Sequence, residues 1–342
     1  MSILDISRYL VDFKFGSISQ PELLFSEAQV RDTTVEDILI SGKEYTKYIN
    51  EFWTSGQRRA SPIHEISYRA CFKPQLPMFF IELFTKPGDI VYDPFGGRGT
   101  TAIEAGLLER IPFSNDISPL SEVLAYPRFF IPKISDLKNR LDVIEILDTS
   151  RQKDMDLSMF YHPDTEKEII SLKKYFQKRQ KSGKEDNLDR WIRMIATSRL
   201  TGHSPGFFSV YTLPPNQAVS AERQKKINIQ RNQIPEYRNT KEIILNKTSS
   251  LVSKISYSEI ENLKLAGQKA EFLNKDARFT KEIPTDSVQL VVTSPPFLDI
   301  VQYAKDNWLR CWFNDLDAEE VQASITMSKT LEQWSEVMAG VL

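Results

Sequence analysis

The sequence predicts an α/β protein with a doubly wound parallel sheet that carries a mostly helical insert. Two short apolar strands flank a glycine-rich turn and a helix near residue 100, and two further strands follow residue 268. About 140 residues separate the two pairs, which is far longer than the loops of a compact domain. The intervening segment is therefore expected to fold as a module of its own.

The first predicted unit is a strand, a tight turn, a helix and a second strand. Residues 88–95 combine a turn with a short buried strand that ends at Pro94, and a glycine-rich turn follows. Residues 100–110 have apolar side chains at helical spacing, and residues 111–116 form a second short strand that ends in an acid.

The remaining strands are predicted at residues 270–273 and 287–292, and a further helix at residues 331–342. The insert contains helical patterns at residues 137–147, 165–180, 188–200 and 221–230. The predicted organisation is an N-terminal extension at 1–60, a discontinuous sheet domain at 61–128 and 268–342, and the insert at 129–267.

Composition excludes several classes of protein. The 342 residues are 41% hydrophobic and 26% charged, which is typical of a soluble globular chain. No apolar run approaches the roughly 20 residues that cross a bilayer, and the start lacks a secretory signal, so we expect a cytoplasmic protein without a membrane partner. Cys71, Cys311 and three scattered histidines are too few for a disulfide framework or a metal site.

Positive charge is concentrated in the predicted insert. Sixteen lysines and arginines stand against six acids between Lys173 and Lys247, although the whole chain has a net charge of −2. Such a segment is either a solvated helical face or a surface for a polyanion. Composition alone leaves both explanations open.

The first motif is Asp93-Pro94-Phe95-Gly96-Gly97-Arg98-Gly99-Thr100-Thr101. Its glycines let the backbone approach a ligand, and the following helix presents unpaired N–H groups to it. With Asp116 downstream, the glycine spacing also fits a loose dinucleotide fingerprint, so a nicotinamide or flavin enzyme is an alternative. Asp93 favours S-adenosylmethionine instead, because a carboxylate at the strand tip would repel a pyrophosphate and attract an α-amino group.

The second motif is Thr293-Ser294-Pro295-Pro296-Phe297 at the end of the fourth strand. Two prolines fix the backbone and remove two N–H donors, which leaves carbonyl groups pointing outward beside an aromatic ring. Such a rigid turn can hold an amine.

Together with the upstream segment at 72–76, these motifs resemble the amino-group, cytosine-N4 or adenine-N6, site-specific DNA methyltransferases. A serine at the first position of the Ser-Pro-Pro-aromatic motif most resembles the cytosine-N4 enzymes, whereas Asp or Asn is more usual in adenine-N6 enzymes. The stretch from Trp191 to Gln217, with Arg223 and Gln224, resembles the insert of bacterial site-specific DNA methylases.

The resemblance implies a role for each matching residue. Asp93, Gly97 and Gly99 would line the methionine part of S-adenosylmethionine, Asp116 would bind the ribose and Asp276 the adenine amine. The implied cofactor set is Lys73, Pro74, Asp93, Pro94, Phe95, Gly97, Gly99, Thr100, Thr101, Asp116, Ile117, Asp276 and Ala277, and the catalytic set is Ser294, Pro295, Pro296 and Phe297. The residues expected to contact double-stranded DNA are Lys173, Lys174, Lys178, Arg179, Arg199, His203, Arg223, Lys225, Lys226 and Arg231.

The expected reaction is methyl transfer to the N4 amine of a flipped-out cytosine in a specific DNA sequence, in restriction-modification or defence. A cognate restriction endonuclease is then an expected partner. The alternatives are an adenine-N6 DNA methyltransferase, an RNA or protein methyltransferase, and a DNA-binding module that has lost catalysis. Sheets of this family continue with further strands after the final helix, which predicts a truncated or split enzyme that needs a complementing C-terminal polypeptide or self-association.

Overall fold

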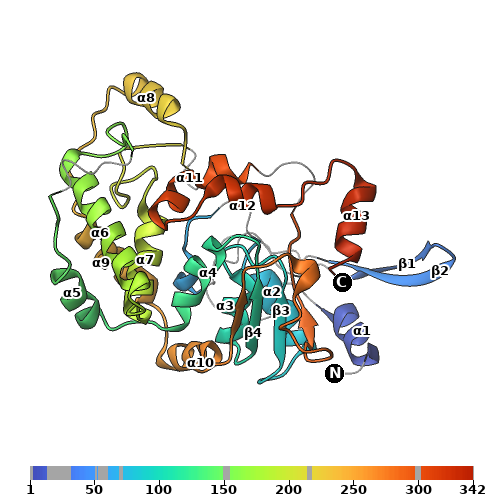
Figure 1. Cartoon of the computed structure of the whole chain (residues 1–342). Coiled ribbons are helices and arrows are strands. Elements are labelled where there is room, and N and C mark those ends of the chain that lie inside the picture. Colours follow the sequence, from blue (N-terminus) through green and yellow to red (C-terminus); the bar gives the residue numbers. More distant parts are fainter. Residues whose placement is uncertain are drawn as a thin grey trace, which may run out of the picture.

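A computed structural model describes residues 3–13, 32–50, 52, 61–68, 72–148, 155–213, 218–296 and 302–341. Within these ranges the chain forms a parallel four-stranded sheet with the order β5-β4-β3-β6 (Figure 1). Its strands are β3 (Ile90–Asp93), β4 (Ile111–Asn115), β5 (Glu271–Leu273) and β6 (Leu290–Val291). The predicted α/β class and parallel sheet are confirmed, whereas the doubly wound arrangement stays a prediction.

The strand order places a change of direction beside β3. The chain moves from β3 to β4 and β5 on one side and then returns to place β6 on the other side. Val91 pairs with Leu290 of β6 and Tyr92 pairs with Phe113 of β4. In open α/β sheets a ligand binds at such a point, outside the carboxyl ends of the strands.

Helices cover the sheet and carry most of its core. The crossover helix α3 (Thr100–Leu107) is buried from Thr100 to Gly106 and packs against α2 (Gln75–Phe84) and α10 (Tyr257–Gly267). The short helix α4 (Leu120–Ala125) continues into the 3₁₀ turn η2 (Tyr126–Phe129), which also contacts α3 and α10.

The segment between the strand pairs is mostly helical, and its helices lie together on one side of the sheet in Figure 1. One hydrophobic cluster includes Ala102 and Ile103 of α3 together with Trp191, Ile195 and Leu251 from this segment. The boundaries at 129 and 267 stay a prediction. The helices are α5 (Ile134–Asp142), α6 (Pro163–Lys181), α7 (Asn187–Arg199), α8 (Ala221–Gln230) and α9 (Thr240–Val252).

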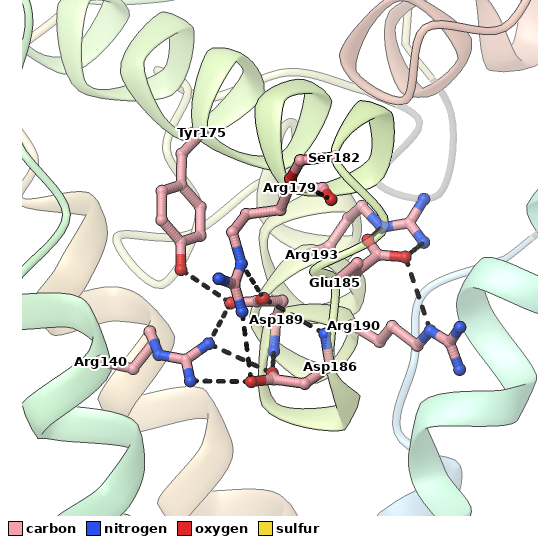
Figure 2. A network of polar contacts seen from close by, with 9 residues as sticks. All are labelled: Arg140, Tyr175, Arg179, Ser182, Glu185, Asp186, Asp189, Arg190 and Arg193. Carbon is pink, nitrogen blue, oxygen red and sulfur yellow. Dashed lines mark hydrogen bonds and ion pairs between the residues drawn. The ribbon is translucent and has the colours of Figure 1, made fainter.

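Figure 2 shows a polar network at the start of α7. Asp186 and Asp189 form a capping box, in which each side chain accepts a hydrogen bond from the other residue's backbone N–H. The Asp189 side chain is fully buried, and it accepts from Arg179 Nε at 2.7 Å, from the Tyr175 hydroxyl at 2.9 Å and from Arg140. The acids at this helix start therefore neutralise Arg179 of the basic segment and Arg140 of α5.

The remaining elements lie near both ends of the chain. The helix predicted at residues 331–342 is present as α13 (Leu331–Ala339), whereas α11 (Tyr303–Phe313) and α12 (Ala318–Ser324) were not predicted. None of the helices in the described ranges is long and apolar enough to cross a membrane. The N-terminal elements are α1 (Ile3–Asp12), the antiparallel hairpin β1 (Thr34–Ile40) and β2 (Lys43–Ile49), and the 3₁₀ turn η1 (Pro62–His64); the last 3₁₀ turn, η3 (Ala277–Phe279), follows β5.

Candidate functional site

A cavity of roughly 290 Å³ opens at the carboxyl ends of the four parallel strands. This volume is near the lower end of the range for small-molecule sites, about 300–1,000 Å³. The cavity brings together residues from the glycine-rich turn, from the segments after β4 and β5, and from the turn after β6. The residues of its wall that the sequence predicted are Pro94, Phe95, Gly97, Asp116, Ile117, Asp276, Ala277, Ser294, Pro295 and Pro296.

The glycine-rich turn has a fixed shape. Gly97 and Gly99 have φ angles of +54° and +80°, which disfavour other residues. A Cβ at position 99 would lie 2.5 Å from the Cβ of Ala125, so the turn also needs glycine for close packing. Beneath it, the fully buried Arg128 donates hydrogen bonds to the carbonyl groups of Arg98 and Ile63.

Asp116 holds the turn from the adjacent strand. Its Oδ2 accepts from the Gly97 N–H at 2.8 Å, and its Oδ1 accepts from the Ser118 N–H at 2.9 Å. Burial raises the pKa of this carboxyl, while the two backbone donors oppose that shift. Each carboxylate oxygen can accept a further hydrogen bond, so Asp116 remains able to bind hydroxyl groups in the cavity.

Asp93 lies beneath the cavity rather than on its wall. Its Oδ1 accepts from the Phe95 N–H at 3.1 Å and from the Thr293 hydroxyl at 2.6 Å, so one carboxylate joins both sequence motifs. Burial raises the pKa of Asp93 to about 6, against the effect of these donors. Its Oδ2 is buried without a hydrogen-bond partner among the described residues.

Asn115 was not predicted as a site residue, although it occupies the end of β4. Its Nδ2 donates to the carbonyl groups of Pro94 at 3.3 Å and Lys275 at 2.9 Å, and its Oδ1 accepts from the Lys275 N–H at 3.1 Å. This side chain therefore ties the glycine-rich turn to the segment after β5. The sequence signal was its position at a strand end, next to Asp116.

Asp276 reaches the cavity from the segment after β5 and is already paired. Its oxygens accept from Arg278 Nε at 2.9 Å and Nη2 at 2.5 Å, and this pair lowers the pKa of Asp276. The ion pair fixes the carboxylate at the rim of the cavity. An adenine amine, the implied ligand, would have to share these oxygens with Arg278.

The turn after β6 is anchored on three sides. Thr101 donates to the Val292 carbonyl at 3.0 Å, and Thr293 donates to Asp93. From α13, the Trp334 indole N–H donates to the Pro296 carbonyl at 2.9 Å. Ser294 and Pro295 line the cavity beside this anchor, and Phe297 lies outside the described residues.

Several wall residues were missed because they come from segments without a recognisable motif. Tyr303 of α11 shares a hydrogen bond with Ser118, and both line the cavity. The apolar spacing of α13 predicted a helix but not its place in the fold. The missed residues are Tyr68, Asn115, Ser118, Lys275, Tyr303, Asp306, Asn307, Ser324, Ile325, Thr326, Met327, Ser328, Trp334, Val337, Met338 and Val341.

Some residues implied for the cofactor stand behind the wall or away from it. Thr100 and Thr101 are buried at the start of α3. Pro74 is buried at the N-terminal cap of α2, and Lys73 before it is exposed. None of these four, nor Gly99, is among the residues that line the cavity.

The residues predicted to contact DNA fall into two groups. Lys173 is buried, donates to the Trp312 carbonyl and lies 3.8 Å from Asp315, and Arg179 is paired with Asp189. Arg199 is also buried, and Lys174 is half-buried. The exposed members are Lys178, His203, Arg223, Lys225, Lys226 and Arg231.

Neither metal nor thiol chemistry has a centre in the described part of the chain. No group of three or more His, Cys, Asp or Glu side chains is placed there to hold a metal ion. Cys311 is buried, and burial raises the pKa of its thiol to about 11, so it stays protonated near neutral pH.

Comparison with known proteins gives a family match and similar methyltransferases. Residues 22–126 match the N6/N4 methyltransferase family model, described as DNA methylase. Over 335 residues the chain is 25% identical to the type II methyltransferase M.BsoBI of Geobacillus stearothermophilus, covering 90% of this chain and 64% of that protein. Over 165 residues it is 30% identical to the type II methyltransferase M.MjaII of Methanocaldococcus jannaschii, covering 46% of this chain and 28% of that protein.

No solved structure matches the chain significantly. By the coverages given above, the chain spans less than two thirds of the length of either curated relative. The glycine-rich turn, the acids after successive strands and the Ser-Pro-Pro turn meet in one cavity, and the family match begins upstream and runs through that turn to residue 126. In these features and in its sequence the chain is similar to the amino-group DNA methyltransferases.

Proposed function

We propose that this chain methylates DNA, using S-adenosylmethionine to modify the exocyclic N4 amine of a flipped-out cytosine in a specific sequence. One observation carries the proposal. The cavity at the strand ends joins the glycine-rich turn, Asp116 and Asp276 to Ser294 and Pro295. A methyl donor and an amine acceptor must meet in such a space for direct transfer.

The residues present fit S-adenosylmethionine. The Oδ2 of Asp93 is buried beneath the cavity wall without a hydrogen-bond partner among the described residues, so the carboxylate can attract a cationic amino group in the cavity electrostatically. Asp116 keeps acceptor capacity for ribose hydroxyls, and Phe95, Ile117 and Ala277 offer apolar surface for a purine. When bound, S-adenosylmethionine supplies an electrophilic methyl group on a sulfonium centre.

The turn after β6 supplies the groups that act on the target amine. The Ser294 hydroxyl and the Pro295 carbonyl accept its two hydrogens, which draws the nitrogen toward tetrahedral geometry and directs its lone pair at the methyl group. The prolines offer no N–H that would compete. The Pro296 carbonyl already accepts from Trp334, so this contact orients the turn and leaves Pro295 for the amine.

The target base must leave the duplex, at a cost of a few kcal/mol. Stacking on an aromatic ring returns about 1–3 kcal/mol per base, and Phe297 is the residue that we propose for it. Exposed basic residues such as Arg223, Lys225 and Lys226 would supply phosphate contacts.

The choice of cytosine rests on Ser294 at the first position of the motif. The name "type II methyltransferase" belongs to the two relatives, and we extend it to this chain as the proposal of a restriction-modification role with a cognate endonuclease.

The test is transfer of a tritiated methyl group from S-adenosylmethionine to genomic DNA by the full natural protein, followed by nucleoside analysis. We expect labelled N4-methylcytosine. Labelled N6-methyladenine would replace the base assignment, and labelled RNA without labelled DNA would overturn the proposed substrate. In the same assay Ser294→Ala should lose most of the methyl transfer. Ser324→Ala is the matched control, because Ser324 lines the same cavity and its hydroxyl donates to the Val321 carbonyl.

A further inference from the structure

Arg199, the last residue of α7, is a buried cation that forms no ion pair with any described residue. Only 8% of its surface is exposed. Its Nε donates to the Ser198 carbonyl at 3.0 Å, whereas neither terminal nitrogen donates to any residue in the described ranges. No carboxylate there forms an ion pair with it. A charge held out of water in this way is costly unless a partner compensates it.

Other buried arginines of the molecule are compensated. Arg128 is fully buried and donates to three backbone carbonyl groups, those of Leu124, Ile63 and Arg98. Arg193 Nε lies 3.0 Å from Glu185 Oε1. Arg199 differs from both, because the tip of its guanidinium group lacks a partner of either kind.

More positive charge lies beside Arg199. Burial, together with the neighbouring Arg310, itself 7% exposed, lowers the pKa of Arg199 to about 10. Lys247 is another neighbouring cation, since Arg199 lowers its pKa after the effect of burial. Glu65 opposes both shifts, but its carboxylate is paired with Lys247 Nζ at 3.3 Å. The cluster therefore has more positive than negative charge.

The guanidinium group is held in a fixed orientation. It lies over the Phe207 ring at 4.1 Å from the ring centroid. The loop that carries Phe207 is itself anchored, because Arg238 donates to the carbonyl groups of Ser204 at 3.1 Å and Phe207 at 2.9 Å. The Phe208 N–H also donates to the Arg199 carbonyl at 2.8 Å. Such preorganisation reduces the entropy lost on binding a ligand.

This cluster borders the proposed active site. Arg310 donates to the Ser67 carbonyl at 3.0 Å and to Asn307 Oδ1 at 3.2 Å, and its guanidinium carbon lies 5.7 Å from the centre of the Tyr68 ring. Tyr68 and Asn307 both line the cavity. Arg310 therefore contacts two residues of the cavity wall and also acts electrostatically on Arg199.

We infer that Arg199, with Lys247 and Arg310 beside it, binds a backbone phosphate group of DNA next to the flipped nucleotide. This inference rests on the proposed function. A guanidinium group can bind two phosphate oxygens with its terminal nitrogens, and the partly desolvated setting strengthens the interaction. The site would fix the register of the backbone without reading the sequence, as phosphate contacts do.

The test compares Arg199→Met with Arg190→Met in the full natural protein. Arg190 lies on the same helix, but Glu185 already pairs with it at 3.5 Å. We expect Arg199→Met to weaken binding of a short DNA duplex by about 10-fold or more and to reduce the slope of log affinity against log salt by about 0.9, the value for one phosphate. Arg190→Met should leave the slope unchanged. Cofactor binding and the melting temperature should not fall in Arg199→Met.

Each contrary outcome overturns a different statement. Unchanged DNA affinity and slope in Arg199→Met, with wild-type binding intact, would refute the phosphate site alone. A lower melting temperature together with weaker cofactor binding would show a structural role instead. Arg199→Lys separates geometry from charge, since it should keep the slope and lose part of the affinity.

A second arm uses inorganic phosphate, which should raise the melting temperature of the wild-type protein but not of Arg199→Met. Phosphate protection without any effect of Arg199→Met on DNA would assign the cluster to a free anion and overturn the DNA role. Absence of methyl transfer and DNA binding in the wild-type protein would instead refute the proposed function.

Discussion

The cavity at the sheet edge and the helical segment beside it use charge in opposite ways. At the cavity, Asp93 and Asp116 accept hydrogen bonds from backbone and hydroxyl groups and keep acceptor capacity. In the helical segment, Asp186 and Asp189 form ion pairs with arginines (Figure 2). A motif therefore locates a site, because local backbone spacing builds it, whereas a sum of charges does not show which cations remain free.

The largest expected effect on activity is that of Ser294→Ala. Loss of the hydroxyl removes a hydrogen-bond acceptor for the target amine, so kcat should fall by roughly 100-fold, within the range for proton-handling groups. Cofactor affinity should change little, because Ser294 acts on the base. Steady-state kinetics and calorimetry measure the two quantities. Wild-type turnover in this variant would show that the Ser294 hydroxyl is not needed for methyl transfer.

The largest expected effect on stability lies in the other region. Asp189→Ala removes a fully buried carboxylate on which Arg140 and Arg179 depend, together with one half of the capping box of α7. The free energy of unfolding should fall by about 3 kcal/mol, as for other broken buried pairs. Denaturant titration checks this value. Asp164→Ala, an exposed acid in the first turn of α6, serves as the control and should cost far less.

Asp93→Asn tests whether the Asp93 carboxylate makes cofactor binding depend on pH. A bound cation favours the ionised carboxylate, so cofactor affinity should fall about tenfold per pH unit below the wild-type pKa of about 6. The Asn variant should bind more weakly at pH 8 and without this dependence. Calorimetry across pH 5 to 8 tests both statements, and parallel pH profiles for the two proteins would contradict the role of Asp93.

The same raised pKa predicts a stability effect in the cofactor-free protein. The folded state holds the Asp93 proton more tightly than the unfolded state, so the protonated carboxyl adds to the free energy of unfolding. This contribution is complete below about pH 4 and is lost as pH rises through about 6. The melting temperature of Asp93→Asn should therefore rise relative to wild type between these pH values. Thermal melts at matched ionic strength measure the difference.

Trp334→Phe should have the smallest effect. It removes the indole donor to the Pro296 carbonyl but keeps an aromatic ring, and one such hydrogen bond contributes about 0.5–1.5 kcal/mol. We expect a several-fold loss of kcat with little change in the melting temperature. Full activity would show that the turn keeps its shape without this hydrogen bond. The control is Trp308→Phe, because the Trp308 indole nitrogen is buried without a hydrogen-bond partner among the described residues.

Much of the sheet, but fewer than half of the residues that line its cavity, could be predicted from the sequence. The strands before Asp93-Pro94, Asp116 and Asp276 were predicted because each apolar run ends at an acid or a proline. Parallel strands place such ends at the same edge of the sheet. The Ser-Pro-Pro turn was predicted for the same reason. These features depend on residues close together in the chain.

The rest depends on contacts between distant segments. Nothing in the sequence near Trp334 shows that its indole reaches Pro296, and nothing near Lys173 shows that its amine is buried against Trp312. The sequence could not show which lysines and arginines are buried or paired, because helical periodicity shows which side chains share a face but not which segment packs against it. Arg179 and Arg199 lie on adjacent helices, yet among the residues that the structure describes only Arg179 is paired with an acid.

The shared hydrophobic cluster has a consequence for engineering. Trp191 and Leu251 pack in the same cluster as Ile103 of the crossover helix, so the two parts of the chain share their largest apolar interior. Exchanging the helical segment for that of a relative would expose or overfill this shared interior and would disturb the glycine-rich turn at the start of α3. New sequence specificity is better sought by changing exposed side chains one at a time than by transplanting the segment as a cassette.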